Sequence, residues 1–256
     1  MRALLAFSKK EIIGQLRSGK LLILGGIFTL FALMNPAVAK LTPWLMETMS
    51  DSLGEMGMTV TAVSVTALDS WVQFFKNIPM ALIAFAVLES SCFTREYRTG
   101  TLVLSLTKGL ERYKVVLAKA VVLTLLWTLG YWLCFGITFL CNEFLWDNSV
   151  AQNLLFSGLC WWLLGLWVTL LTVLLSTVFS SNIGVLAGTG GTVLGIYLLG
   201  TVPRLGKYLP TFLGNGNALI FGTEEPPAYT PAILITAALC LICFAAAIPV
   251  FNKKKL

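Results

Sequence analysis

The sequence predicts an all-α membrane protein in which a single domain, residues 1–256, crosses the bilayer six times. Six apolar stretches are each long enough to span a hydrocarbon core of about 30 Å, which takes roughly 20 helical residues. Charged residues make up only 12% of the chain and lie mostly between these stretches. Helices are expected because they satisfy their own backbone polar groups in lipid. The stretches run at about 21–41, 76–93, 115–140, 153–178, 183–202 and 231–251.

The distribution of charge predicts that both termini lie in the cytoplasm. With the ends placed inside, the inner segments hold 14 of the 18 basic residues. These are Arg2, Lys9, Lys10, Arg17, Lys20, Arg95, Arg98, Lys108, Arg112, Lys114, Lys119, Lys253, Lys254 and Lys255. The outer segments hold eight acidic residues, Glu47, Asp51, Glu55, Asp69, Glu143, Asp147, Glu224 and Glu225. This is the asymmetry of the positive-inside rule.

Residues 1–20 predict a helix that lies in the inner headgroup layer. Leu5, Ile12 and Leu16 share one helical face, although Lys9 falls inside the stripe. A basic flank beside an apolar stripe suits the membrane surface, and a soluble helical tail is the alternative. The segment carries five basic residues and no small-residue cleavage site, so we expect the first span to act as its own insertion signal.

The second span ends with Glu89, the only acidic residue placed inside a span. A charge deep in the bilayer is costly, but Glu89 lies about one helical turn from the inner boundary, where partners and water are in reach. We expect it either to pair with Arg95 or a basic residue of the amino-terminal segment, or to line a transport route.

The fourth and fifth spans each carry a distinctive residue pattern. Trp161, Trp162 and Trp167 make the fourth span aromatic, which suggests a hydrophobic or amphipathic cargo such as a drug or peptide, or side chains that face lipid. Four residues, 179–182, separate it from the fifth span and predict a tight inner hairpin. The fifth span carries glycines at small-x-x-x-small spacing, which permits close helix approach within the chain or between subunits. They are Gly184, Gly188, Gly191 and Gly195.

The outer segment 203–230 is too apolar for a free loop and too interrupted by proline for a full span. We expect a re-entrant or surface-lying pair of short helices there. The sixth span then ends in three consecutive lysines, Lys253 to Lys255, which anchor it at the inner face.

Residues suited to catalysis are scarce. The chain contains no histidine, which removes the usual general base and the commonest metal ligand. We therefore expect no catalytic residues, no metal and no cofactor. Residues 14–20 read G-x-x-x-x-G-K, but a phosphate-binding loop needs Ser or Thr next and a strand before it, and residue 21 is leucine. The chain is not expected to bind ATP by that route.

Cysteines and net charge point to no further chemistry. Cys240 and Cys243 form a C-x-x-C inside an apolar helix, which favours packing over redox chemistry. The net charge of +6 is explained by anionic lipid headgroups at the inner face, so membrane lipids are expected partners and nucleic acid is not.

The inner loop 94–114 carries a recognisable pattern. Its parts, in order, are Glu96, Gly100-Thr101-Leu102, the leucine-rich turn Leu104-Ser105-Leu106, Arg112 and then Lys119 at the start of the third span. This resembles the loop after the second span in permeases of the type-2 ABC exporter family. Gly109-Leu110 stands where that family often has Pro-Val. The layout of six spans, inner termini and a broken outer segment before the sixth resembles the family as well.

The resemblance implies a permease in a bacterial cell membrane that exports a cargo as a dimer, with a second copy or a close paralogue. Two partner ATP-binding cassette subunits would hydrolyse the ATP. In the family a short helix of this loop docks into the ATPase, here about 101–108. Gly100 is expected to end the preceding helix, and Leu102, Val103 and Leu106 to form its apolar face. We expect Leu102 and Leu106 to seat in the partner and Glu96 and Arg112 to fix the angle of the loop.

Two other classes remain open from the residues alone. A self-contained secondary transporter usually places ionisable residues deep in several spans and often shows internal repeats. This chain offers only Glu89 and no visible repeat. An intramembrane enzyme is disfavoured by the missing histidine and the missing catalytic motifs.

Overall fold

The computed structural model describes residues 2–48, 64–107, 109–202 and 204–254, and its long elements are helices. They are α1 (Arg2–Arg17), α2 (Lys20–Thr48), α4 (Ala67–Glu89), α5 (Ser91–Thr99), α6 (Thr101–Thr107), α7 (Arg112–Leu145), α8 (Leu154–Val178), α9 (Asn182–Gly200) and α11 (Thr230–Lys253). Within these residues, six helices are long and apolar enough to cross a membrane, the second running on through α5. The predicted fold class is confirmed. Of the charged residues used for orientation, Asp51, Glu55, Lys108 and Lys255 lie outside the described residues.

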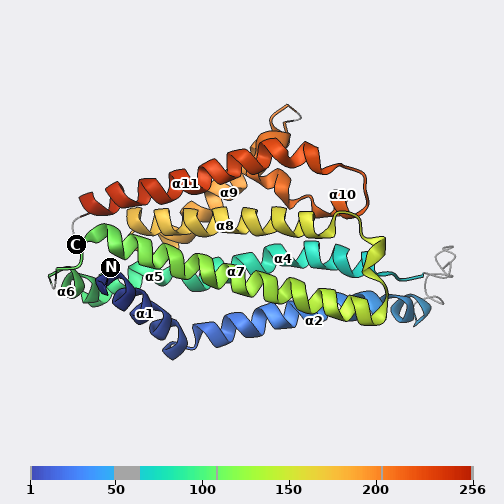
Figure 1. The fold of residues 1–256 in the computed structure, drawn as a ribbon, viewed down its shortest axis with the longest axis horizontal. Coiled ribbons are helices and arrows are strands. Elements are labelled where there is room, and N and C mark those ends of the chain that lie inside the picture. Colours follow the sequence, from blue (N-terminus) through green and yellow to red (C-terminus); the bar gives the residue numbers. More distant parts are fainter. Residues whose placement is uncertain (1, 49–63, 108, 203, 255–256) are drawn as a thin grey trace.

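The long helices form one bundle around α8, which packs against α7, α9 and α11. Helix α2 lies on the other side and packs against α4 and α7. Both termini lie at one end of the bundle, together with α1, α5 and α6, and we call this the terminal end (Figure 1). The opposite end, called the far end, carries α10 (Gly216–Ile220). An even number of spans explains why the termini share an end.

Aromatic side chains fill the centre of the bundle. Trp127 of α7 is fully buried, and its Nε1 donates to the backbone oxygen of Trp162, 3.1 Å away. Gly165 of α8 makes this approach possible, because a Cβ there would lie 2.0 Å from the Trp127 ring. Tyr131, one turn further along α7, donates to the backbone oxygen of Gly158 at 2.7 Å. Large rings from α7 thus pack directly against the backbone of α8.

The tryptophans of the fourth span correct an expectation. Trp161 and Trp167 are buried inside the chain, so neither lines an open cargo path nor faces lipid. Trp161 Nε1 donates to the Gly214 backbone oxygen at 2.9 Å, and Trp162 Nε1 donates to Thr128 Oγ1 at 3.1 Å. A buried indole N–H needs such a partner. These tryptophans are buried because α8 lies at the centre of the bundle, where it contacts other helices and not lipid.

The segment before the sixth span folds into short helical turns that cover the far end of α8. They are η2 (Gly206–Tyr208), η3 (Pro210–Gly214), α10 and η4 (Pro226–Tyr229). Leu213, Leu219, Ile220 and Tyr229 are fully buried there, and Tyr229 Oη donates to the Asn215 backbone oxygen at 3.0 Å. Short broken helices were expected. Whether they re-enter the membrane stays a prediction.

Candidate functional site

The inner loop forms two short helices at the terminal end. Helix α5 ends at Gly100, whose φ of 68° is left-handed and therefore favours glycine. Helix α6 follows, and Thr101 Oγ1 at its start lies 3.0 Å from Thr99 Oγ1. The next turn contains Gly109, which also has a positive φ, of 86°. Gly100 therefore ends the preceding helix as expected from the sequence.

The apolar face of α6 differs from the expected one. Leu102 is only 1% exposed and belongs to the chain's own core, and Leu106 is half-buried against that core. Val103 and Leu104 are 42% and 62% exposed. Because Leu102 is already buried within the chain, it is not free to seat in a partner. The exposed apolar side chains of α6 that a partner could cover are Val103 and Leu104.

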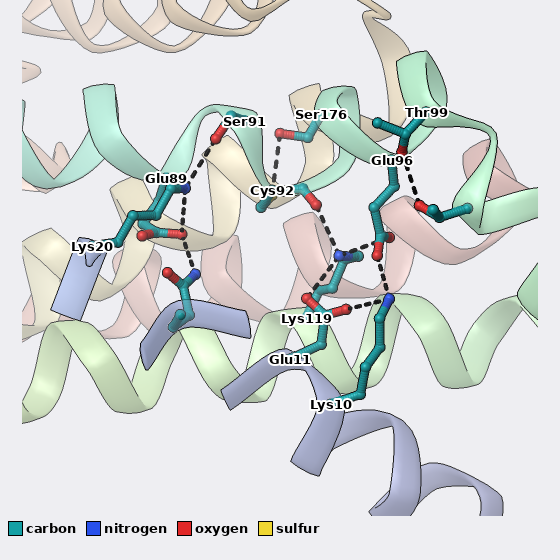
Figure 2. Close-up of polar contacts among 12 residues, drawn as sticks. Lys10, Glu11, Lys20, Glu89, Ser91, Cys92, Glu96, Thr99, Lys119 and Ser176 are labelled. Carbon is teal, nitrogen blue, oxygen red and sulfur yellow. Dashed lines mark hydrogen bonds and ion pairs between the residues drawn. The ribbon is translucent and has the colours of Figure 1, made fainter. Parts of the chain in front are cut away.

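A buried lysine holds three helices together at the same end. Lys119 of α7 is 1% exposed, and its Nζ lies 2.8 Å from Glu11 Oε2 of α1 and 3.0 Å from Glu96 Oε2 of α5. It also donates to the backbone oxygen of Cys92 at 2.8 Å. Figure 2 shows Glu11 and Glu96 lying between this ammonium group and that of Lys10, which pairs with both carboxylates. We call Lys10, Glu11, Glu96 and Lys119 the charge cluster.

The charge cluster makes α1 part of the same mechanical unit as the loop. Lys10 of α1 pairs with Glu96 and lies 3.4 Å from Glu11 Oε1. Removing one partner from a buried ion pair leaves an uncompensated charge, which is strongly unfavourable. Any displacement of α5 must therefore carry α1 and the start of α7 with it, or break these pairs.

Glu89 joins a second contact between the same segments. It is fully buried, its Oε2 accepts from Gln15 Nε2 at 2.7 Å, and Lys20 Nζ lies 3.7 Å from the same oxygen. Lys20 also donates to the Leu88 backbone oxygen at 2.6 Å and to Ser91 Oγ at 2.9 Å, and Figure 2 shows the contact with Ser91. Two pairings were expected for Glu89, with Arg95 or with a basic residue of the amino-terminal segment. The second is confirmed, and the residue is Lys20. Whether Glu89 also lines a transport route stays a prediction.

Arg112 fixes the end of the sixth span instead of contacting the loop directly. Its Nη1 donates to the backbone oxygens of Phe251, Asn252 and Lys254 at 3.0, 2.9 and 2.8 Å. These carbonyls lie at the carboxyl end of α11, where helices lack internal donors. One guanidinium thus joins the start of α7 to the end of α11.

Lys254 and Tyr97 complete the connections at this end. Lys254 Nζ donates to the Phe179 backbone oxygen at 3.0 Å and lies 4.2 Å from the centre of the Tyr97 ring. Partial burial lowers the pKa of this ammonium group. Tyr97 Oη donates to the Ser176 backbone oxygen at 3.2 Å. Helix α5 is therefore attached to the ends of both α8 and α11.

The glycines of α9 separate into two groups. A Cβ on Gly184 or Gly188 would lie 3.1 or 3.0 Å from ring atoms of Phe179, so these two serve packing within the chain. A Cβ on Gly191 or Gly195 would meet no atom within 4 Å. Internal packing therefore accounts for Gly184 and Gly188, whereas a subunit interface at Gly191 and Gly195 stays a prediction.

Sequence reasoning missed the roles of Lys119 and Glu11. Lys119 was noted only as an inner basic residue and as the last residue of the loop pattern, and Glu11 was not singled out. Glu96 and Lys119 carry opposite charges at the two ends of the loop pattern, so an ion pair between them could have been predicted from the sequence. Nothing in the local sequence places Glu11 beside a lysine 108 residues away.

The fold and the contacts at the terminal end define a multi-pass α-helical membrane protein. Residues 5–256 match the family described as ABC-2 family transporter protein. The match covers nearly the whole chain, which therefore belongs to this family and is an ABC transporter permease, the membrane component of a transport system. No curated protein matches the chain.

Proposed function

We propose that the chain is the permease subunit of an ATP-driven exporter, with ATP hydrolysis supplied by separate ATP-binding cassette subunits that dock on α6. The observation that carries the proposal is the loop itself. Val103 and Leu104 project from a short helix at the terminal end, and α5 beside it is held to α1, α7 and α8 by buried polar contacts. A force on α6 would be passed to several spans at once.

The form of residues 14–20 supports separate ATPase subunits. Gly14 lies in α1, its backbone oxygen accepts from Ser18 N at 3.0 Å, and Lys20 begins α2. A phosphate-binding loop instead follows a strand and presents its backbone N–H groups to the phosphates. The expectation that this chain leaves ATP chemistry to a partner rests on that geometry.

A hydrophobic or amphipathic cargo is supported by the exposed apolar side chains of α9, provided that two subunits enclose them. Because the tryptophans of α8 are buried, they give no support for it. Leu194, Leu198 and Leu199 of α9 are exposed, and α9 is the least buried of the six spans. Two copies, or this chain and a close paralogue, would enclose such faces between them.

The test of the proposal is purification of the tagged protein from its native membrane under mild detergent, with identification of the subunits that accompany it. We expect an ATP-binding cassette subunit in equal amount to the permease. Recovery of an intact permease with no nucleotide-binding subunit, in several detergents and in nanodiscs, would argue for the self-contained carrier instead.

The two glycine groups of α9 predict different mutant behaviour. Gly191→Leu should weaken dimerisation without changing the apparent unfolding temperature of the monomer, because its Cβ would point into open space. Gly188→Leu should lower that temperature, because the side chain would collide with Phe179 and Leu175. Single-molecule photobleaching in nanodiscs and thermal unfolding in detergent measure the two effects.

Gly136 of α7 supplies the matched control, since a Cβ there also meets no atom within 4 Å. Gly136→Leu should leave the dimer intact. If Gly191→Leu leaves dimerisation unchanged, or Gly136→Leu disrupts it equally, α9 is not the subunit interface.

Orientation is tested by cysteine labelling of intact cells in a cysteine-free background. The positive-inside rule predicts that a membrane-impermeant reagent labels Glu225→Cys and does not label Thr107→Cys. Both side chains lie outside the candidate spans, one at each end of the bundle. Labelling of Thr107→Cys from outside would reverse the orientation and place the loop beyond the reach of a cytoplasmic ATPase.

A further inference from the structure

A cavity of about 400 Å³ opens at the terminal end between α1, the start of α2, α5 and the start of α7. Its walls are unusually basic for a space beside a membrane. Five cationic side chains line it, namely Lys10, Arg17, Lys20, Arg95 and Lys119. Several lie within Figure 2, around the charge cluster and Glu89. A cavity of this kind suits an anionic ligand.

The charges at this cavity do not balance. Glu11 and Glu96 also line it, and Glu89 contacts its wall through Lys20. These three carboxylates pair with three of the cations, Lys10, Lys20 and Lys119. Among the described residues, Arg17 and Arg95 have no acidic partner, which leaves two guanidinium groups uncompensated. Guanidinium groups recognise phosphate oxygens with two parallel hydrogen bonds.

The backbone adds to the positive potential. Helix α2 begins at Lys20, on the cavity wall, and runs for 29 residues. The N–H groups of a first helical turn have no acceptor within the helix, and the aligned peptide dipoles favour an anion at that end. The last turn of α1 also lines the cavity, and its carboxyl-end dipole offsets part of this effect, so the two unpaired arginines supply most of the attraction for an anion.

The apolar surroundings identify the source of the anion. Lys20, the first residue of α2, donates to Leu88 near the end of α4 and to Ser91 just beyond it. Apolar side chains close to this junction are exposed, namely Leu22 and Ile23 of α2 and Ile83 and Val87 of α4. Acyl chains of a lipid would run along these side chains while its headgroup occupied the cavity. A free phosphate ion would make no contact with these side chains, so the comparison of lipid with inorganic phosphate decides between the two sources.

We propose that this cavity is a specific binding site for an anionic phospholipid of the inner leaflet, whose phosphate lies between Arg17 and Arg95. The site is distinct from the α6 surface assigned to the ATPase. It attaches one lipid to the junction of α1 and α2 beside the charge cluster. General attraction of a basic face to anionic lipid would not require a defined cavity.

The test is native mass spectrometry of the full-length protein with three probes: phosphatidylglycerol, phosphatidylcholine with the same acyl chains, and inorganic phosphate. We expect one phosphatidylglycerol to be retained per chain and phosphatidylcholine to be lost. Arg17→Gln with Arg95→Gln should weaken phosphatidylglycerol binding about 25-fold, since each basic side chain near an anionic headgroup contributes roughly a factor of five.

Two further variants decide the outcome. Lys9→Gln with Lys253→Gln removes the same charge from exposed positions at the same end but outside the cavity, and should keep the lipid. Arg17→Lys with Arg95→Lys restores the charge and should recover most of the binding. Equal loss in the cavity and control variants would overturn the proposal in favour of general surface attraction. Retention of inorganic phosphate as firmly as phosphatidylglycerol would overturn the lipid as the occupant, and so would retention of phosphatidylcholine.

Discussion

Replacing Lys119 with methionine is expected to destabilise the protein by about 3–5 kcal/mol, the usual cost of breaking a buried ion pair from one side. Glu11 and Glu96 would keep their charges and lose the buried ammonium group that faces both. For a chain of this size that loss corresponds to a fall of roughly 6–20 °C in the apparent unfolding temperature. Thermal unfolding in detergent, followed by tryptophan fluorescence, measures it.

Rescue separates the charge from the packing of this side chain. Lys119→Met combined with Glu11→Gln and Glu96→Gln removes the uncompensated charges and should recover much of the lost stability. Lys9→Met changes an exposed lysine of α1 and should change stability by less than about 0.5 kcal/mol. An unfolding temperature for Lys119→Met equal to that of Lys9→Met would show that the charge cluster contributes nothing to the fold.

Replacing Val103 and Leu104 together with aspartate is expected to release the ATPase while the permease remains folded. Val103 and Leu104 are 42% and 62% exposed, so covering what remains exposed contributes about 1.5–3 kcal/mol for the two together before ordering costs. Their loss should weaken docking by roughly 10- to 150-fold, since about 1.4 kcal/mol is a factor of ten. The measurement is the yield of the ATP-binding cassette subunit that co-purifies with the tagged permease.

The control must add the same charge without removing an apolar contact and without changing α6. Ser180→Asp with Asn252→Asp places two carboxylates at exposed polar positions of the terminal end and should retain the subunit. Leu102→Asp should behave differently from both, because Leu102 is buried in the chain and its change should lower the unfolding temperature. If the subunit still co-purifies at full yield with Val103→Asp and Leu104→Asp, α6 is not the docking element.

Hydropathy predicted the number and order of the spans better than it predicted their ends. The fourth span was expected at 153–178 and forms Leu154–Val178. The first was expected at 21–41, but α2 continues to Thr48 through Pro36 and Pro43. An apolar window records the part of a helix that suits lipid, whereas the helix itself ends where its backbone hydrogen bonds end.

The candidate site was only partly readable because its contacts join distant parts of the chain. Gly100 acts through its own backbone conformation, so the sequence was sufficient to place the break. Arg112 instead contacts a carbonyl 139 residues away, and Leu102 is buried by neighbours that a short loop does not reveal. A helical pattern shows which residues share a face, but the burial of that face is decided by packing.

The most direct test of the account is the rate of ATP hydrolysis measured for three purified samples: the permease alone, its co-purified cassette subunit alone, and the two reconstituted together in nanodiscs. We predict no hydrolysis by the permease, and a rate for the subunit that changes on reconstitution and reverts to that of the free subunit when the permease carries Val103→Asp and Leu104→Asp. Hydrolysis by the permease alone, or a subunit whose rate is indifferent to the permease, would contradict the claim that this chain is driven by a separate ATPase through α6.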